Sequence, residues 1–305
     1  MCKQWIYMVV LLLGMSPTDA TSKTPNHVFQ ITEKILIHLT EINERNFSQT
    51  NFNPAEKIPA LPRHVYFLAR EQWRKVQLLR FMNGLDTSSL PGITISEITP
   101  GDVLSVTEAL LQDIRELGPA YGLADHAASA PLPSGKKPAD VYENLLRISA
   151  QLDALGIPAT VPNDVYRVAD TLLSSMERVT SEAGVRVNID DVAESNGRSP
   201  SDVYNAVRDL SEALERVTKE NASLAIKNGV LEIPAKNEAV TPSDVIVALN
   251  LVLADTVSLM AVQKTSDTLE MASYSGGKTP SDVYRLVRQS HLLIDSMGSG
   301  TPSSF

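Results

Sequence analysis

The chain has 305 residues, 43% hydrophobic and 21% charged, which is the composition of an ordinary globular protein of one or two domains. Its net charge of −9 and scattered basic residues argue against nucleic acid as a partner, because phosphate binding needs clustered Lys and Arg. Its single cysteine, Cys2, excludes an internal disulfide and a cluster of thiolate metal ligands.

The first twenty residues have the layout of a cleavable secretory signal. Lys3 precedes an apolar run at 5–15, and a Ser-Pro pair interrupts the chain before the small residue Ala20. Eleven apolar residues are too few to span a bilayer core of about 30 Å. We therefore expect residues 1–20 to be removed, leaving a periplasmic or secreted chain without an integral membrane segment. A buried N-terminal core helix is the alternative.

One motif recurs eight times along the rest of the chain. In its most complete copies it reads Thr/Ser-Pro-x-Asp-Val-Tyr, as at Ser199 and Thr279. Five of the seven intervals between copies are 37 or 38 residues long, which predicts repetition of one structural unit. The motif prolines are Pro25, Pro62, Pro100, Pro138, Pro162, Pro200, Pro242 and Pro280.

Each copy of the motif is a helix start signal. Thr or Ser is a favoured N-cap, and proline loses nothing at the first helical position. A carboxylate at the third helical position faces the positive end of the helix dipole and can complete a capping box. Two copies carry His27 and His64 at this position, and three copies lack the cap hydroxyl, so we expect weaker starts there. The six carboxylates are Asp102, Asp140, Asp164, Asp202, Asp244 and Asp282.

Apolar residues follow each start in alternating steps of four and three. The copy at Pro200 shows the pattern at Val203, Val207, Leu210, Leu214 and Val217. This spacing is the narrow seam of helices that pack in bundles. We therefore expect an all-α fold of eight repeated amphipathic helices in helical-bundle packing, each about 18 to 22 residues long.

Long irregular linkers separate most of the expected helices. A linker of this length can run back along a whole helix, so successive helices can lie parallel or alternate in direction. Three linkers also contain short β-prone pieces. These pieces lie at 92–96, 184–189 and 229–233.

The connection at 156–160 is the exception, because five residues cannot return along a helix. It predicts an antiparallel hairpin and divides the chain into two groups of four helices. We expect helical repeats 1–4 at 21–156, repeats 5–8 at 157–298 and a flexible tail at 299–305. A continuous bundle or an open solenoid is the alternative.

Few residues point to chemistry. The chain has no recognisable catalytic, zinc-protease or phosphate-loop motif, so we expect no enzyme activity, no cofactor and no metal. The one metal pair worth considering is His27 with His64, because both occupy the same repeat position. The six motif carboxylates are already explained as helix-start residues.

An aromatic residue follows the motif valine in six copies, one residue beyond the seam. Each ring can seal the end of a bundle with its polar edge in water. Alternatively, parallel helices can gather the rings on one rim that binds a protein or an apolar ligand. The candidate rim consists of Phe29, Tyr66, Tyr142, Tyr166, Tyr204 and Tyr284.

These features predict an exported, non-enzymatic helical repeat protein. We expect it to act as an interaction or scaffold module in the periplasm or cell exterior, with a protein partner or through self-association. The alternative is a small-molecule-binding helical bundle, a sensor or carrier with a pocket between helices. An active site carried by the linkers is a third hypothesis.

Overall fold

The computed structural model describes residues 23–53, 57–265 and 268–298 and shows an all-α fold. Its eight long helices begin at the eight motif prolines, as predicted. They are α1 Pro25–Arg45, α2 Pro62–Met82, α3 Pro100–Leu117, α4 Pro138–Ala154, α5 Pro162–Glu182, α6 Pro200–Glu220, α7 Pro242–Val262 and α8 Pro280–Gly298. The expected secretory signal and C-terminal tail lie outside the described residues.

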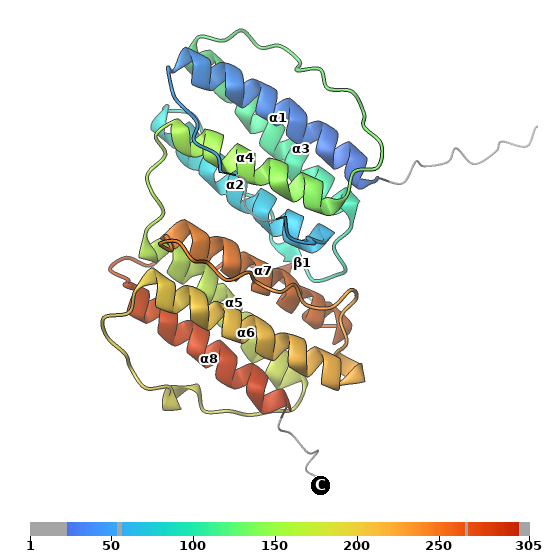
Figure 1. Ribbon diagram of the computed structural model, residues 1–305, viewed down its shortest axis with the longest axis vertical. Helices are drawn as coiled ribbons and strands as arrows, with labels where there is room; N and C mark the ends of the chain where they lie inside the picture. Colours follow the sequence, from blue (N-terminus) through green and yellow to red (C-terminus); the bar gives the residue numbers. More distant parts are fainter. Residues whose placement is uncertain (1–22, 54–56, 266–267, 299–305) are drawn as a thin grey trace, which may run out of the picture.

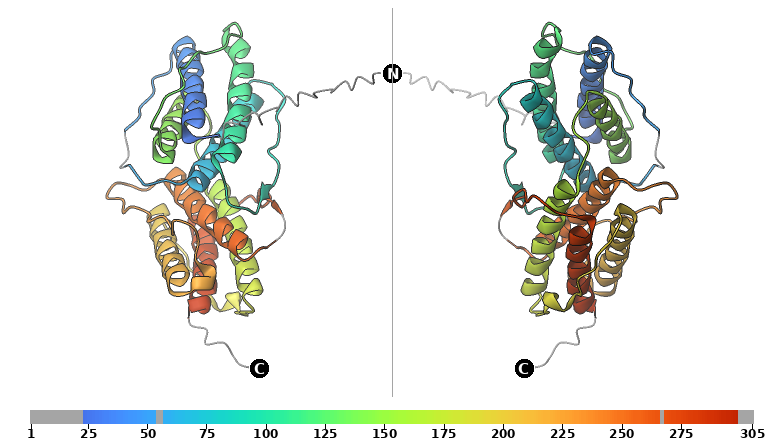
Figure 2. Two further views of the ribbon diagram at one scale, coloured as in Figure 1. Left: turned by 90° about the vertical axis from the view of Figure 1, so that its right-hand side faces the viewer. Right: turned by 90° about the vertical axis from the view of Figure 1, so that its left-hand side faces the viewer.

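The helices form two four-helix bundles. Helices α1–α4 make bundle 1, in the upper half of Figure 1, and α5–α8 make bundle 2 below it, and the side views of Figure 2 show the same division. In bundle 1, α1 and α2 each pack against both α3 and α4, and in bundle 2, α5 and α6 each pack against both α7 and α8. The two bundles therefore share one topology, in which the first helix lies diagonal to the second and the third lies diagonal to the fourth.

Within each bundle the four helices run in the same direction. The motif prolines and valines of α1–α4 surround one small gap at the end of bundle 1, and those of α5–α8 do the same in bundle 2. The linkers carry the chain back along the helices. The linker after α3 lies along α1, where Gln30 Nε2 donates to Ala130 O at 2.7 Å and Lys136 N donates to Asn26 Oδ1 at 2.8 Å. The parallel arrangement, which the sequence left open, is the one adopted.

The two bundles point in opposite directions. Arg63 at the start of α2 meets Asp255 near the end of α7. Farther along α2, Arg74 lies 3.8 Å from Asp164 at the start of α5. The short connection after α4 does reverse the chain, but α4 and α5 are not among the packed helix pairs, so the expected hairpin packing is wrong. The bundles meet through α2 and α7 instead.

The linkers contain little regular structure. One of the three β-prone pieces forms a strand, β1 Ile93–Thr94, which pairs antiparallel with β2 Thr268–Leu269 and so ties a linker of bundle 1 to one of bundle 2. The pieces at 184–189 and 229–233 form no strand, and Leu231 and Ile233 are buried individually. Three 3-10 turns also lie in the linkers: η1 Gly118–Tyr121, η2 Ile189–Asp191 and η3 Ala222–Leu224.

Helix α7 is apolar on nearly every side. Its length and its mean hydropathy of 2.2 over 18 residues would allow it to cross a membrane, yet 78% of that window is buried inside the structure. It is therefore the core helix of the junction between the bundles. Among the described residues no other helix passes the same test, which leaves no clear integral membrane segment in this part of the chain.

Candidate functional site

The motif carboxylates cap the helices. In α3, Thr99 N and Thr99 Oγ1 donate to Asp102 Oδ2 at 2.7 and 2.6 Å, and Asp102 N donates back to Thr99 Oγ1 at 3.4 Å. The starts of α6, α7 and α8 repeat this capping box. In α4 and α5, which lack the cap hydroxyl, the Asp still accepts from the backbone of the cap residue. These contacts account for the repeated Asp without any further role.

The two histidines at the third helical position act as caps as well. His27 Nδ1 accepts from Thr24 N at 3.2 Å, and His64 Nδ1 accepts from Leu61 N at 3.0 Å. We expected weaker starts for want of a carboxylate, but a ring nitrogen supplies the acceptor. His64 Nε2 is also bonded, to Asp255 Oδ1 at 2.9 Å. With both of its ring nitrogens occupied, His64 cannot form a metal pair with His27.

The six candidate rim residues lie in two groups. Each bundle gathers three of them near its own helix starts, and because the bundles point in opposite directions, the six do not share one rim. Tyr142 and Tyr204 are only 4% exposed, and Tyr204 Oη donates to Pro234 O at 2.9 Å. Burial, and secondarily the neighbouring Tyr204, raises the pKa of Tyr142 above its usual value. The other four rings are half-buried.

Three of the half-buried rings lie under a cation from the linker that enters a neighbouring helix. Each cation stands two residues before a motif proline. The pairs are Lys136 on Phe29 at 3.9 Å, Lys278 on Tyr166 at 4.3 Å and Arg198 on Tyr284 at 4.4 Å, measured to the ring centre. Cation–π contacts of this kind stabilise the bundle ends. Whether the rings also bind a partner stays a prediction.

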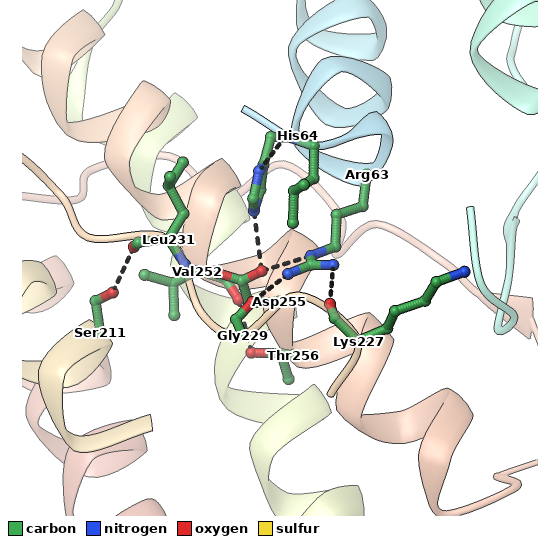
Figure 3. Close-up of polar contacts among 10 residues, drawn as sticks. Arg63, His64, Ser211, Lys227, Gly229, Leu231, Val252, Asp255 and Thr256 are labelled. Carbon is green, nitrogen blue, oxygen red and sulfur yellow. Dashed lines mark hydrogen bonds and ion pairs between the residues drawn. The ribbon is translucent and has the colours of Figure 1, made fainter. Parts of the chain in front are cut away.

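A buried ionic cluster joins the two bundles (Figure 3). Asp255 on α7 is fully buried, and its Oδ1 accepts from Arg63 Nε at 2.6 Å and from His64 Nε2 at 2.9 Å. Its Oδ2 accepts from Leu231 N at 3.0 Å. Since both carboxylate oxygens have partners and one of these is a counter-charge, the buried charge is compensated.

The same arginine holds the linker between α6 and α7. Arg63 Nη1 donates to Lys227 O at 3.0 Å, and Arg63 Nη2 donates to Gly229 O (Figure 3). Asn228 and Gly229 have positive φ angles of 63° and 68°, a conformation that Asn and Gly adopt most readily. This turn presents both carbonyl groups to Arg63, so α2 is bonded both to α7 and to the α6–α7 linker of bundle 2.

A cavity of about 460 Å³ lies farther along the same junction. Helix α2 lines it with Phe67, Trp73 and Phe81, and α5 and α7 complete the wall. The linker segments 87–90 and 270–271 close its rim, and they are joined by the adjoining β1–β2 pair. Glu270 approaches Gly92 so closely that a side chain on Gly92 would collide with its carboxylate.

Two of the arginines that line the cavity, Arg70 and Arg74, have partners within the protein. Arg74 forms a two-pronged contact with Glu71, at 2.7 to 3.2 Å, and Arg70 Nη2 donates to Pro91 O at 2.9 Å. Burial lowers the pKa of Arg74, but Glu71 outweighs this effect, so the pKa lies above its usual value. Neither guanidinium needs a ligand to satisfy it.

Arg167 and Asn250 differ from these residues. Both line the cavity, from α5 and α7, and neither side chain makes a hydrogen bond or ion pair with any residue that the structure describes. Asn250 is only 6% exposed, and it lines the cavity. Burial, and then the positive charge of Arg74, lowers the pKa of Arg167, and the nearby carboxylates of Glu71 and Asp164 oppose this shift. The cavity therefore presents one guanidinium without a direct ion pair and one unused amide.

Sequence reasoning did not find these residues. One available signal was α7 itself, where Asn250 and Asp255 interrupt a run from Val245 to Val262 whose other polar residues are only the small Thr256 and Ser258. Arg167 carried no comparable signal, because an arginine on one amphipathic helix resembles any solvated residue. Comparison with family models, curated proteins and solved structures finds no match for the chain.

Proposed function

We propose that this protein is an exported, non-catalytic binding protein that holds a small organic anion in the junction cavity. The observation that carries the proposal is the pair of side chains, Arg167 and Asn250, that line one cavity without a hydrogen bond or ion pair to any described residue. A cavity of about 460 Å³ falls within the range typical of small-molecule sites. Export rests on residues 1–20, which have the composition of a secretory signal.

The lining indicates the chemistry of the ligand. A guanidinium binds a carboxylate through two parallel hydrogen bonds, and an amide side chain can donate to the same group or to a neighbouring oxygen. Aromatic and aliphatic walls, from Phe67, Trp73 and Leu78, suit an apolar body. The best-supported ligand is therefore a carboxylate on an apolar group, with its acidic end at Arg167.

The scaffold hypothesis has less support. It rested on the repeat architecture, the absence of catalytic motifs, the acidic composition and the long linkers, and the aromatic rim was its candidate partner surface. The rings lie in two groups instead of one rim, and two of the tyrosines are buried. Half-buried rings under linker cations have a structural explanation already. The proposal therefore follows the second sequence-based hypothesis, a small-molecule-binding bundle.

Thermal unfolding with matched ligand pairs tests the proposal. Phenylacetate and phenylacetamide have the same shape but differ in charge, as do hexanoate and hexanamide. We expect a carboxylate to raise the melting temperature further at each higher concentration, with the logarithmic dependence of a ligand that binds only the folded state. We expect its amide to have little effect. A panel in which no carboxylate exceeds its amide would contradict an anion site.

The variant Arg167→Gln locates the site, and Arg186→Gln, in an exposed linker, is its matched control. We expect Arg167→Gln to lose carboxylate binding while its ligand-free melting temperature stays the same or rises slightly, because a half-buried cation without a direct ion pair is removed. Arg186→Gln should bind normally. Loss of stability without loss of binding would instead make Arg167 a structural residue.

A further inference from the structure

A second cluster of polar side chains lies in bundle 1, away from the junction cavity. His38 and Glu41 are one turn apart on α1, so that both project from the same face. His126 comes from the linker that returns along α1. Contacts of Ala130 and Lys136 with α1 hold this linker in place, and an ion pair of Arg115 with Asp125 at 2.8 Å fixes the residue before His126.

The three side chains have the geometry of a metal-binding group. One ligand atom from each of His38, Glu41 and His126 lies within 4.8 Å of the others. The closest pair, His126 Nε2 and Glu41 Oε2, is 3.2 Å apart, and the two imidazole rings are 5.0 Å apart between centres. Ligand atoms of a tetrahedral zinc ion are about 3.3 Å apart, given bonds of roughly 2.0 Å. A small movement of the exposed His126 would close the site.

Two of these atoms are buried without a hydrogen-bond partner among the described residues. His38 is only 6% exposed, and its Nε2 makes no hydrogen bond. Glu41 Oε2 is equally buried and also makes none. His38 Nε2 is thus buried without a partner in the described chain, and Glu41 Oε2 faces two imidazole nitrogens, His126 Nε2 at 3.2 Å and His38 Nδ1 at 3.9 Å.

The orientation of His126 adds a second argument. Its Nδ1 lies 3.2 Å from Ala124 O, and because a carbonyl only accepts, Nδ1 carries the proton. In a neutral ring this leaves the Nε2 lone pair facing the Glu41 carboxylate, an unfavourable contact at 3.2 Å. A cation between the two atoms removes the repulsion. A backbone carbonyl that orients the second ring nitrogen is also the usual support of a histidine ligand.

We propose that His38, Glu41 and His126 bind a Zn²⁺ ion on the face of α1 that the α3–α4 linker covers. Two imidazoles and one carboxylate form a three-ligand set that leaves the fourth position for water or another donor. The bound ion would fasten the linker to α1. This site is independent of the junction cavity, since none of its three residues lines that space.

Zinc titration of the untagged full chain, after removal of metal with a chelator, tests the site. We expect wild type to bind one Zn²⁺ by calorimetry, with a higher melting temperature that reverses when chelator is added. His126→Ala removes an exposed ligand and leaves the core intact, and it should bind at least about tenfold more weakly. His291→Ala on α8, outside the cluster, is the matched control and should bind as wild type does.

Substitution of Co²⁺ for Zn²⁺ gives a second readout. Wild type should show the visible absorption of a cobalt ion with nitrogen ligands, and Glu41→Gln and His126→Ala should lose it while retaining their circular dichroism spectrum. Zinc that neither binds nor changes the melting temperature would overturn the proposal and leave a protonated His126 paired with Glu41. Equal binding by His126→Ala and wild type would overturn it as well.

Discussion

The two bundles share one topology but differ at their helix starts. Bundle 2 has an Asp at the third position of all four helices, whereas bundle 1 has two Asp and two His. In a parallel bundle four positive helix ends lie side by side, so negative caps are favourable. In bundle 1 histidines replace two of these carboxylates. At His64 the replacement adds a contact, because the second ring nitrogen bonds to Asp255 in the other bundle.

The two helices that join the bundles are buried more completely than the others. In α2 and in α7, 14 of the 21 residues are buried, whereas the other six long helices bury 10 or fewer. Departures from the motif do not distinguish them, because α3 lacks the motif tyrosine as α7 does, and α4 and α5 lack the cap hydroxyl as α2 does. The shared seam therefore builds each bundle, and burial beyond the seam marks the contact between them.

The largest expected effect comes from breaking this contact at Asp255. The variant Asp255→Ala leaves the Arg63 guanidinium buried without its counter-charge, so we expect the free energy of unfolding to fall by about 3 to 5 kcal/mol. Urea denaturation followed by circular dichroism measures the loss. Asp295→Ala, which breaks an exposed ion pair with Arg216, is the control and should cost less than about 1 kcal/mol. Equal losses would show that the buried cluster does not hold the bundles together.

A smaller effect tests the helix starts in each bundle. Thr241 Oγ1 accepts from Asp244 N at 3.3 Å in α7, so Thr241→Ala should lower the free energy of unfolding by about 1 kcal/mol. Lys137, the cap of α4 in bundle 1, offers no such acceptor. Lys137→Thr should therefore raise stability by up to about 1 kcal/mol. Changes of the same sign in both variants would argue against the capping account.

The smallest expected effect is a loss of stability at the helix starts in acid solution. In bundle 2 the pKa values of three capping carboxylates, Asp202, Asp244 and Asp282, lie below the usual value, and in bundle 1 that of Asp140 is lowered. Hydrogen bonds from Ser199 and Thr279 lower those of Asp202 and Asp282. Burial opposes the shift at Asp244, but Lys236 and Thr241 outweigh it.

A lowered pKa in the folded state means that each carboxylate adds stability above the unfolded value of about 3.9. That contribution is lost as the pH falls through the folded pKa. Hydrogen exchange measured by mass spectrometry from about pH 5 to about pH 3 should therefore show the starts of α6, α7 and α8 opening as the pH falls. Unchanged exchange at these three starts, after correction for intrinsic exchange rates, would contradict the stabilising role of the capping carboxylates.

The sequence predicts the helices well because each start carries local information. The cap residue, the proline and the Asp interact within one helical turn, and the apolar spacing that follows is a property of that single helix. The relative direction of the helices is not set by local sequence, because linkers of this length permit both parallel and antiparallel neighbours. The structure shows the parallel order, since the motif valines of four helices meet at one end of each bundle. The wrong hairpin has the same origin, because a short connection sets direction but not which helices pack.

The candidate sites depend even more on distant contacts. Arg167 and Asn250 meet only because two oppositely directed bundles pack through α2 and α7. His38 and His126 meet because one linker returns along α1. In the sequence each residue has an ordinary local explanation. The polar residues of α7 were the exception, since an amide and a carboxylate in an apolar helix need buried partners.

The most direct test of the central claim is a nuclear magnetic resonance titration of the isotope-labelled protein with phenylacetate and phenylacetamide. The account predicts that the Asn250 side-chain amide and the Arg167 Nε–H signals shift together and saturably with phenylacetate, because both groups face the junction cavity and lack partners. Phenylacetamide should shift them far less. Shifts confined to the aromatic residues at the bundle ends, such as Tyr166 and Tyr284, with Asn250 and Arg167 unchanged, would contradict it.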